Sequence, residues 1–205
     1  MDENLRLVAG DELDGLTIRG DYSDAHLEGL RLEEAHIVRT SFVAADLRRL
    51  SLVDVVVEAS DFSGADVEEA SFTRVTFKGC RMSGARLPRT QMRDVTFSDV
   101  KLDDGNFRMG SGDRILFDHV NLERGDFYSA QLTSTRFFDC DLTGADVAKA
   151  KLSGARFHGS ALSDLKGGEY LRNVVIDSSQ VLPLAARVFA GLNIRIEDDR
   201  DALNP

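Results

Sequence analysis

A large apolar residue recurs at every fifth position over most of this chain, and this period restricts the fold more than any other feature. The central residues, as we call them, are Tyr22, Leu27, Leu32, Ile37, Phe42, Leu47, Leu52, Val57, Phe62, Val67, Phe72, Phe77, Met82, Leu87, Met92, Phe97, Leu102, Phe107, Phe117, Leu122, Phe127, Leu132, Phe137, Leu142, Val147, Leu152, Phe157 and Leu162. One step of the series fails, at Gly112, and the register then resumes unchanged. A period of five fits neither an α-helix, whose face recurs near 3.6 residues, nor a lone strand, whose face recurs every two.

A mostly small residue lies two positions before each central residue, and we call this the small position. Its occupants include Ala25, Ala35, Ala45, Ala65, Ala70, Ala85, Ala130, Ala145, Ala150 and Ala155, with Thr40, Ser60, Cys80 and Cys140 as variants. Residues two apart on an extended segment point the same way, so both are expected to face the interior while the polar residues turn a corner. Each five-residue unit is then one side of a coil. Leu30, Leu50 and Ile115 depart from the small-residue rule and predict local widening.

The phenylalanines indicate four units per coil. Phe77, Phe97, Phe117, Phe137 and Phe157 recur at every fourth unit, which predicts a stack of rings at the ~4.8 Å spacing of paired strands. The four sides are named here by their first central residue: the Tyr22, Leu27, Leu32 and Ile37 sides.

Several units carry a recognisable signature. The segments 45–49, 65–69 and 145–149 each begin with Ala-Asp followed by Leu or Val, and they resemble the repeats of the pentapeptide-repeat family. The resemblance covers residues 20–164. It implies an all-β solenoid, a right-handed quadrilateral parallel β-helix, with a short C-terminal α-helical cap. The chain's ending also resembles that of members which protect DNA gyrase and give fluoroquinolone resistance.

Three regions are expected along the chain. Residues 1–19 form an N-terminal cap, taken as an irregular lid with Leu5, Leu7, Leu13, Leu16 and Ile18; residues 20–164 form the repeat β-helix; and residues 165–205 form a last partial coil with a helix and strand cap and a charged tail. Caps are needed because an open stack exposes strand edges. After Leu162 the register is predicted to shift by three, to Leu165, Tyr170 and Val175.

A helix is expected from Ser179 as its N-cap, with Pro183 in the first turn. Its apolar stripe consists of Leu182, Ala185, Phe189 and Leu192, and residues 192–196 alternate like a short strand. Two roles for the stripe stay open. It covers the last coil, or it joins two chains end to end into a homodimer, as the resemblance implies.

Composition restricts the partners. With 35 acidic and 25 basic residues the formal net charge is -10, which argues against direct binding to nucleic acid or to an anionic membrane. The N-terminus is acidic and no apolar run reaches the ~18 residues of a membrane span, so we expect a cytoplasmic protein with a basic or neutral protein partner.

No catalytic constellation is recognisable, and we expect no enzyme, cofactor or metal site. His26, His36, His119 and His158 take outward positions. Cys80 and Cys140 lie three coils apart and are expected to be buried free thiols. The segment 110–113 lacks the lysine of a phosphate loop, so a bulged or flexible corner is predicted there.

Acidic residues concentrate on the Tyr22 side, where eight carboxylates face three basic residues. This predicted acidic face consists of Asp21, Asp24, Asp61, Asp103, Asp104, Glu123, Asp141 and Asp164. The sharper hypothesis is a DNA mimic that binds and protects DNA gyrase or another type II topoisomerase, guided by electrostatic complementarity. The alternative is a generic cytoplasmic interaction module with an unrelated protein partner.

Overall fold

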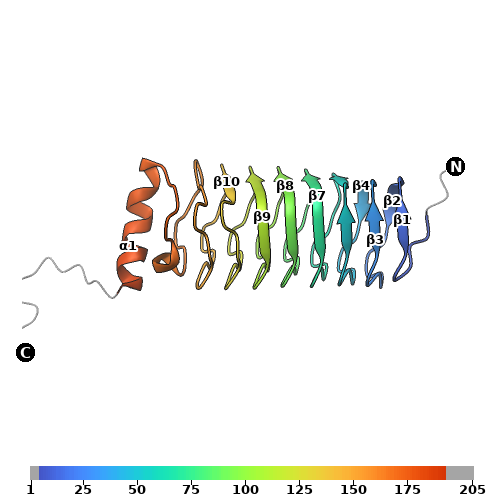
Figure 1. The fold of residues 1–205 in the computed structure, drawn as a ribbon, viewed down its shortest axis with the longest axis horizontal. Helices are drawn as coiled ribbons and strands as arrows, with labels where there is room; N and C mark the ends of the chain where they lie inside the picture. The colour runs from blue at the N-terminus through green and yellow to red at the C-terminus, as the bar shows by residue number, and fades with distance from the viewer. Residues whose placement is uncertain (1–4, 193–205) are drawn as a thin grey trace, which may run out of the picture.

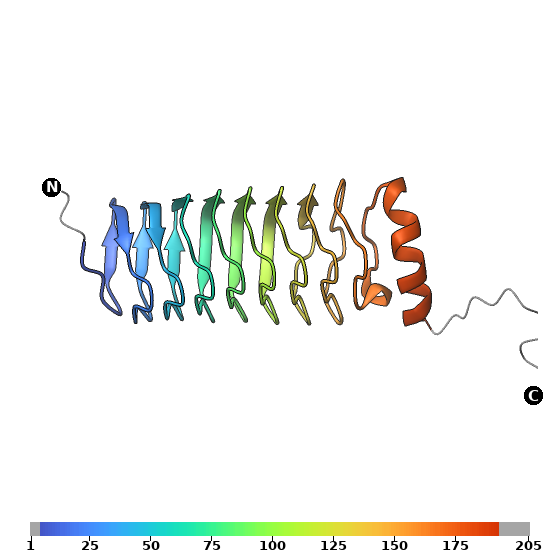
Figure 2. The same cartoon turned by 180° about the vertical axis from the view of Figure 1, so that it is seen from behind.

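The computed structural model describes residues 5–192, which form a rod of stacked coils closed at one end by a helix (Figure 1). The strands are β1 (Glu12–Asp14), β2 (Thr17–Asp21), β3 (Arg31–Glu33), β4 (His36–Ser41), β5 (Ser51–Val53), β6 (Val56–Glu58), β7 (Ser71–Lys78), β8 (Gln91–Ser98), β9 (Ser111–Asp118) and β10 (Arg136–Phe138). Two short 3-10 turns, Gly168–Tyr170 and Ser178–Gln180, precede helix α1 (Val181–Gly191). Seen from behind, the coils follow one another from the N-terminus to α1 (Figure 2).

All the strand pairs are parallel, and they occupy two adjoining sides of the coil. Strands β1, β3 and β5 lie on the Leu32 side, β2, β4, β6 and β10 on the Ile37 side, and β7, β8 and β9 cross both. The register advances by one whole coil, so that Phe77 pairs with Phe97 and Phe97 with Phe117. The other two sides stack through isolated parallel bridges such as Asp61 with Arg81. The prediction of four five-residue sides per coil is confirmed.

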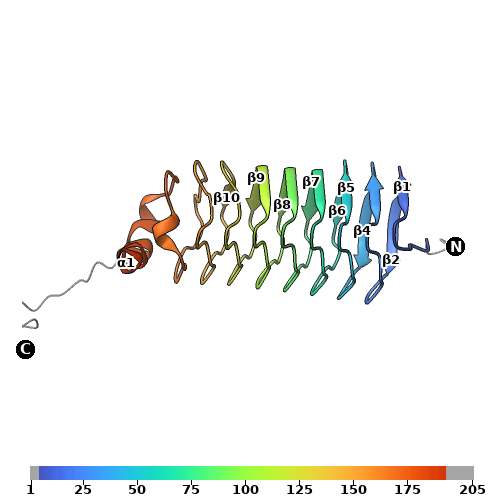
Figure 3. The same ribbon diagram turned by 60° about the horizontal axis from the view of Figure 1, so that its bottom comes forward.

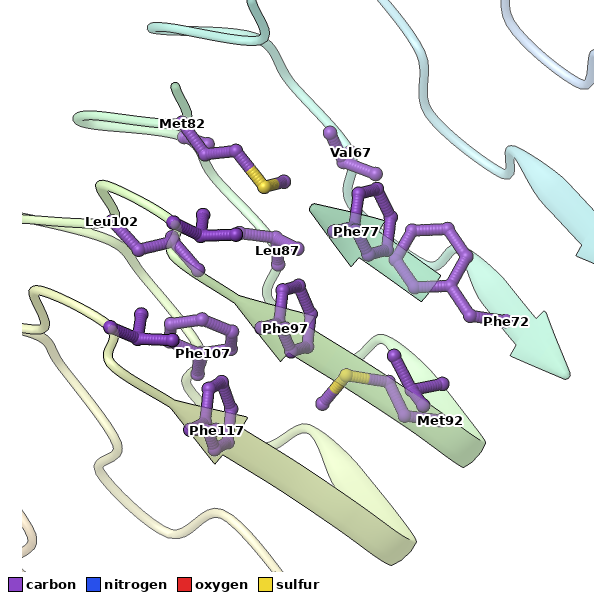
Figure 4. Packing of buried hydrophobic residues seen from close by; sticks show 14 of the residues in the cluster. Val67, Phe72, Phe77, Met82, Leu87, Met92, Phe97, Leu102, Phe107 and Phe117 are labelled. Carbon is purple, nitrogen blue, oxygen red and sulfur yellow. The ribbon is translucent and has the colours of Figure 1, made fainter. Parts of the chain in front are cut away.

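Aromatic stacks form the centre of the rod. Consecutive rings from Phe77 to Phe157 on the Ile37 side have centroids 4.8–5.0 Å apart and are tilted by only 2–6°. Figure 4 shows Phe77, Phe97 and Phe117 in this stack, with Phe107 beside them. Phe107 meets Phe117 edge-on at 6.1 Å, so the stacks of different sides also contact one another. Burying each such side chain stabilises the fold by roughly 1.5–3 kcal/mol.

The interior tolerates larger residues at the small position than the repeat suggests. On the Ile37 side, Val55, Val75, Val95 and Ile115 occupy this position and are all buried. Three of them lie within the long strands, where β-branched residues are favoured. The small position is thus restricted in shape rather than reserved for alanine.

The expected bulge or flexible corner at residues 110–113 is wrong. Strand β9 includes Gly112 and pairs with β8 without a shift, Gly112 lying opposite Met92. A Cβ at Gly112 would come within 2.7 Å of Ile115 Cγ1 and 2.8 Å of Leu132 Cδ2. Ile115, at the small position of the next unit, therefore fills the space that a side chain at residue 112 would occupy.

Backbone geometry at the corners explains a feature that the sequence pattern did not reveal. Two residues after nearly every central residue, φ is positive, as at Asp24 (57°), Arg49 (58°) and Gly64 (66°). At Phe62 the carbonyl also accepts a hydrogen bond from the amide of Ala65, 3.0 Å away. A hydrogen bond between these two positions, with positive φ at the residue before the donor, is the geometry of a type II turn. Glycine meets this requirement without strain.

The N-terminal cap is more regular than the expected lid. Strands β1 and β2 pair with β3 and β4 and so form a first, partial coil, in which Leu13 lies opposite Leu32 and Ile18 opposite Ile37. The offset between these partners is one residue shorter than a whole coil. Because of this difference, Leu13 and Ile18 do not fall on the five-residue series that starts at Tyr22.

At the other end, Leu165 does not begin a shifted register. It is buried at a small position, and its neighbour Lys166 pairs with Asp146 at the regular offset of one whole coil. The shift comes later, where Val175 pairs with Arg156 at an offset that is again one residue shorter.

Asp177, not Ser179, caps the following turn. Its carboxylate accepts the Ser179 amide, while its own amide donates to the side chain of Gln180. Gln180 is buried and its side-chain amide donates to the carbonyl of Ser160 at 2.6 Å. It thus provides a hydrogen-bond partner for a backbone carbonyl at the edge of the last coil. Helix α1 then begins, and Pro183 lies in its first turn as predicted. The strand expected at 192–196 falls almost wholly outside the described residues.

Replacing Ala65 by leucine is expected to overpack the core, because Ala65 is completely buried at a small position. We expect a loss of about 1–3 kcal/mol in the free energy of unfolding, measured by denaturant titration. The matched control is Ala161→Leu, since Ala161 is exposed. Equal stability of the two variants would contradict the packing account.

Gly64 tests the corner conformation separately from packing. Its φ is +66° and a Cβ there would have no atom within 4 Å, so any loss must come from the backbone. Gly64→Val is expected to cost about 1–2 kcal/mol, whereas Gly64→Asn is expected to cost less because asparagine enters this conformation more readily. Thermal unfolding of both variants measures the difference. Equal losses would show that the corner does not require positive φ.

Candidate interaction surfaces

The parallel register aligns the predicted acidic face along the rod. Asp21 pairs with Ser41, and bridges continue the column from Ser41 through Asp61 and on to Asp141. Three of these carboxylates also organise their own turns: Asp21, Asp61 and Asp141 each accept, at 2.9 Å, the backbone amide two residues later. The Ser23 hydroxyl, which also donates to Asp21, is the main cause of a lowered pKa for that carboxyl. These acids therefore serve the fold as well as the surface.

The middle of the acidic face is neutralised by basic side chains. Arg124 donates two hydrogen bonds of 2.8 Å to Asp104 and also contacts Glu123, and the bonds from Arg124 hold the pKa of Asp104 below its usual range. Lys101 lies 3.8 Å from Asp103. The acidic residues in the middle of this side therefore add little net negative charge.

Asp164, near the C-terminal end of the face, forms an ion pair with Arg187 of α1. Asp24, near the N-terminal end, is exposed. The acidic face is consequently strongest over its first coils, at Asp21, Asp24 and Asp61.

A second asymmetry runs along the rod axis. Residues 5–70 contain 15 acidic and 6 basic residues, a net charge of -9, whereas residues 71–192 contain 14 acidic and 17 basic residues, a net charge of +3. Sorting charges by side alone conceals this difference, because each side runs the length of the rod. The N-terminal third of the chain therefore carries most of the negative charge.

Helix α1 has two apolar surfaces. Leu184 is buried and packs on the last coil, and Val188 lines the same apolar pocket with Leu171, Val174 and Ile176. The stripe identified in the sequence overlaps this contact: half-buried Ala185 and Phe189, which is 38% exposed, line the same pocket, while Leu182 is 84% and Leu192 55% exposed. In Figure 1, α1 lies across the end of the rod, with the coils on its inner side.

The histidine and cysteine residues mostly match expectation. His119 lies 3.0 Å from Asp118, and Asp139 of the next coil comes close enough for the three to surround a common point. The sequence reading missed this grouping because the residues belong to different coils. All three side chains are at the surface. Cys80 and Cys140 are buried and free, and burial raises the pKa of Cys140 to about 11.

No helix within residues 5–192 is long and apolar enough to cross a membrane.

Coils of four five-residue sides, with positive φ at their corners and type II turns at corners such as 62–65, together define a solenoid of pentapeptide repeats. Two family models agree: "Pentapeptide repeat region" matches residues 70–145, and "Pentapeptide repeats (8 copies)" matches residues 130–164. The repeat region at residues 70–164 belongs to the pentapeptide-repeat family. No curated protein sequence matches it.

Among solved structures, similar chains include two of QnrB1, a plasmid-mediated fluoroquinolone resistance protein. One is 20% identical, covers 95% of this chain and 94% of that chain, and gives a TM-score of 0.48; the other is 17% identical, covers 87% and 99%, and gives 0.45. A third is HetL from the cyanobacterium Nostoc, a pentapeptide repeat protein involved in heterocyst differentiation regulation, with 17% identity, 83% and 89% coverage, and a TM-score of 0.35.

Proposed function

We propose that this chain is a non-enzymatic interaction scaffold that binds a protein partner through its outer surface. The observation that carries the proposal is that each repeat separates core residues from surface residues. Two of every five residues fill a closely packed core, and the other three project from a rigid and regular exterior. Such a surface presents charges at intervals fixed by the coil, which suits recognition of an extended partner.

The scaffold is proposed to be a homodimer joined through α1. Leu184 and Val188, with Ala185 and Phe189 beside them, already line the contact with the last coil, so the apolar surface left exposed at Leu182, Leu192 and part of Phe189 exceeds what the cap needs. Exposed apolar residues grouped on one helix are typical of protein–protein contacts. Pairing two such helices would give a longer rod with an acidic end at each extremity.

Charge substitutions test the dimer. Leu182→Glu combined with Leu192→Glu is expected to convert the protein to a monomer with unchanged circular dichroism, because it places carboxylates in the apolar contact and leaves the pocket against the last coil intact. The control is Ala190→Glu, another exposed position of α1. Sedimentation velocity measures the mass. A wild-type chain that stays monomeric at high concentration would rule out the dimer.

For the partner we propose DNA gyrase or another type II topoisomerase, a cytoplasmic enzyme that binds DNA through basic surfaces. The proposal is supported by the chain's net charge of -10 and by the acidic face, whose strongest part lies at Asp21, Asp24 and Asp61. The neutral centre around Arg124 and the ion pair of Asp164 favour contact through the first coils of the face. An unrelated basic protein partner is the alternative that this centre leaves open.

A supercoiling assay with and without a quinolone tests the proposed partner. Micromolar wild-type protein is expected to inhibit the enzyme or protect it from the drug, and Asp21→Lys, Asp24→Lys and Asp61→Lys together are expected to abolish the effect. The control triple variant is Asp99→Lys, Asp113→Lys and Asp139→Lys, which changes the net charge equally on other sides. Absence of any effect from the wild-type protein would exclude these enzymes as partners.

A further inference from the structure

The two ends of the rod are capped differently. The C-terminal end is covered by α1 and by the side chain of Gln180. At the N-terminal end, β1 and β2 are the two outermost strands of the sheet, and within residues 5–192 each pairs on one side only, with β3 and with β4. Figure 3 shows both strands at this end of the rod.

The free edge of β1 presents unpaired backbone groups. Asp11 and Gly15 flank β1: the carbonyl of Asp11 accepts the Arg31 amide at 2.8 Å, and the Gly15 amide donates to the Glu33 carbonyl at 3.0 Å, so every second residue of the segment 11–15 points toward β3. Because backbone groups of successive strand residues point to opposite edges, those of Glu12 and Asp14 point away from the rod. An unpaired edge of this kind is a template for another strand.

The core is also incompletely covered at this end. Leu13 is only partly buried, whereas the other central residues of its column that carry a side chain, from Leu32 to Leu152, are buried. Leu16 is 36% and Val8 44% exposed. An added strand would therefore bury apolar surface as well as pair backbone groups.

Charge identifies the kind of strand. Glu12 and Asp14 flank Leu13 on β1, and Asp14 lies opposite Glu33 in the register, where neither acid forms an ion pair within residues 5–192. Arg31, in the next coil, lies opposite Glu12 and contacts its carboxylate at 2.6 Å. A basic residue one coil away along the rod can therefore form an ion pair with this position. A second copy of this chain would oppose one acidic edge to another, which like-charge repulsion disfavours.

We propose that the edge of β1 binds an extended segment of another protein, with the pattern basic–apolar–basic, as an additional parallel strand. The apolar residue covers Leu13, and the basic residues lie over Glu12 and Asp14. This is strand addition, in which main-chain bonds give affinity and alternate side chains give specificity. The inference shares the idea of a protein-binding scaffold with the proposed function, but it uses neither the acidic face nor α1.

Fluorescence anisotropy with synthetic peptides tests the site. The probe is a labelled seven-residue peptide that alternates lysine and valine, compared with the same peptide carrying glutamate in place of lysine and with one N-methylated at alternate residues. Only the first is expected to bind. Equal binding of the N-methylated peptide would overturn the proposal, since strand addition needs the amide hydrogens; no binding of the first peptide would also overturn it.

Variants locate the contact. Glu12→Lys with Asp14→Lys is expected to weaken binding by about tenfold or more. The control is Asp99→Lys with Asp113→Lys, where Asp113 follows a central position of the same side as Asp14 does, and binding is expected to change less than about twofold. Equal weakening by both pairs would show that net charge alone attracts the peptide.

Hydrogen exchange in the free protein completes the test. The amides of Glu12 and Asp14 are expected to exchange quickly and to become protected when the peptide binds. Protection already present without the peptide would mean that the edge is covered, and the proposal would fall. Because Asp21, Asp24 and Asp61 are intact in the Glu12 and Asp14 variant, the supercoiling assay on that variant separates this site from the proposed topoisomerase contact.

Discussion

Stacking of identical side-chain positions at one-coil intervals is the interaction on which the rest of this structure depends. On the Ile37 side, each ring from Phe77 to Phe157 lies on the ring of the next coil at 4.8–5.0 Å, and the strands and bridges between the two end coils follow the same register. The stack fixes the cross-section, and the cross-section limits the small position. The corners must then turn sharply, which is why positive φ recurs two residues after the central position. Exterior residues are left free to vary.

That freedom accounts for the uneven charge. Ion pairs between adjacent coils, such as Arg124 with Asp104 or Arg74 with Asp54, neutralise much of the surface at one-coil intervals. They lie outside the core and contribute little to stability at exposed sites. The net charge that is left is negative in the N-terminal third of the chain and slightly positive in the rest. This distribution affects which partners the protein attracts and has little effect on its folding.

Sequence periodicity predicted the coil, its four sides and the buried cysteines because packing repeats in register with the chain. The prediction from periodicity failed where the offset between coils changes and where a residue of another unit fills the space of a missing side chain. The partial coil at Leu13 and Ile18 is offset by one residue less than a whole coil, and Gly112 is filled by Ile115, a contact between two different units. The apolar stripe of α1 was visible in the sequence, but the contact with the last coil through Leu184 was not, since a helical period alone does not say which face meets the coil. Grouping of Asp118, His119 and Asp139 likewise depends on contact between coils.

Deletion of one whole coil tests the central claim most directly. Removing the segment 83–102 takes out four complete units and joins equivalent positions, so the shortened chain is expected to keep a cooperative thermal transition close to that of the parent. Removing only the segment 83–100 stops short of a whole coil and destroys the register, and this variant is expected to lose the transition. Circular dichroism melting of the two proteins decides the matter. Equal stability of both, or loss of folding in both, would contradict the account.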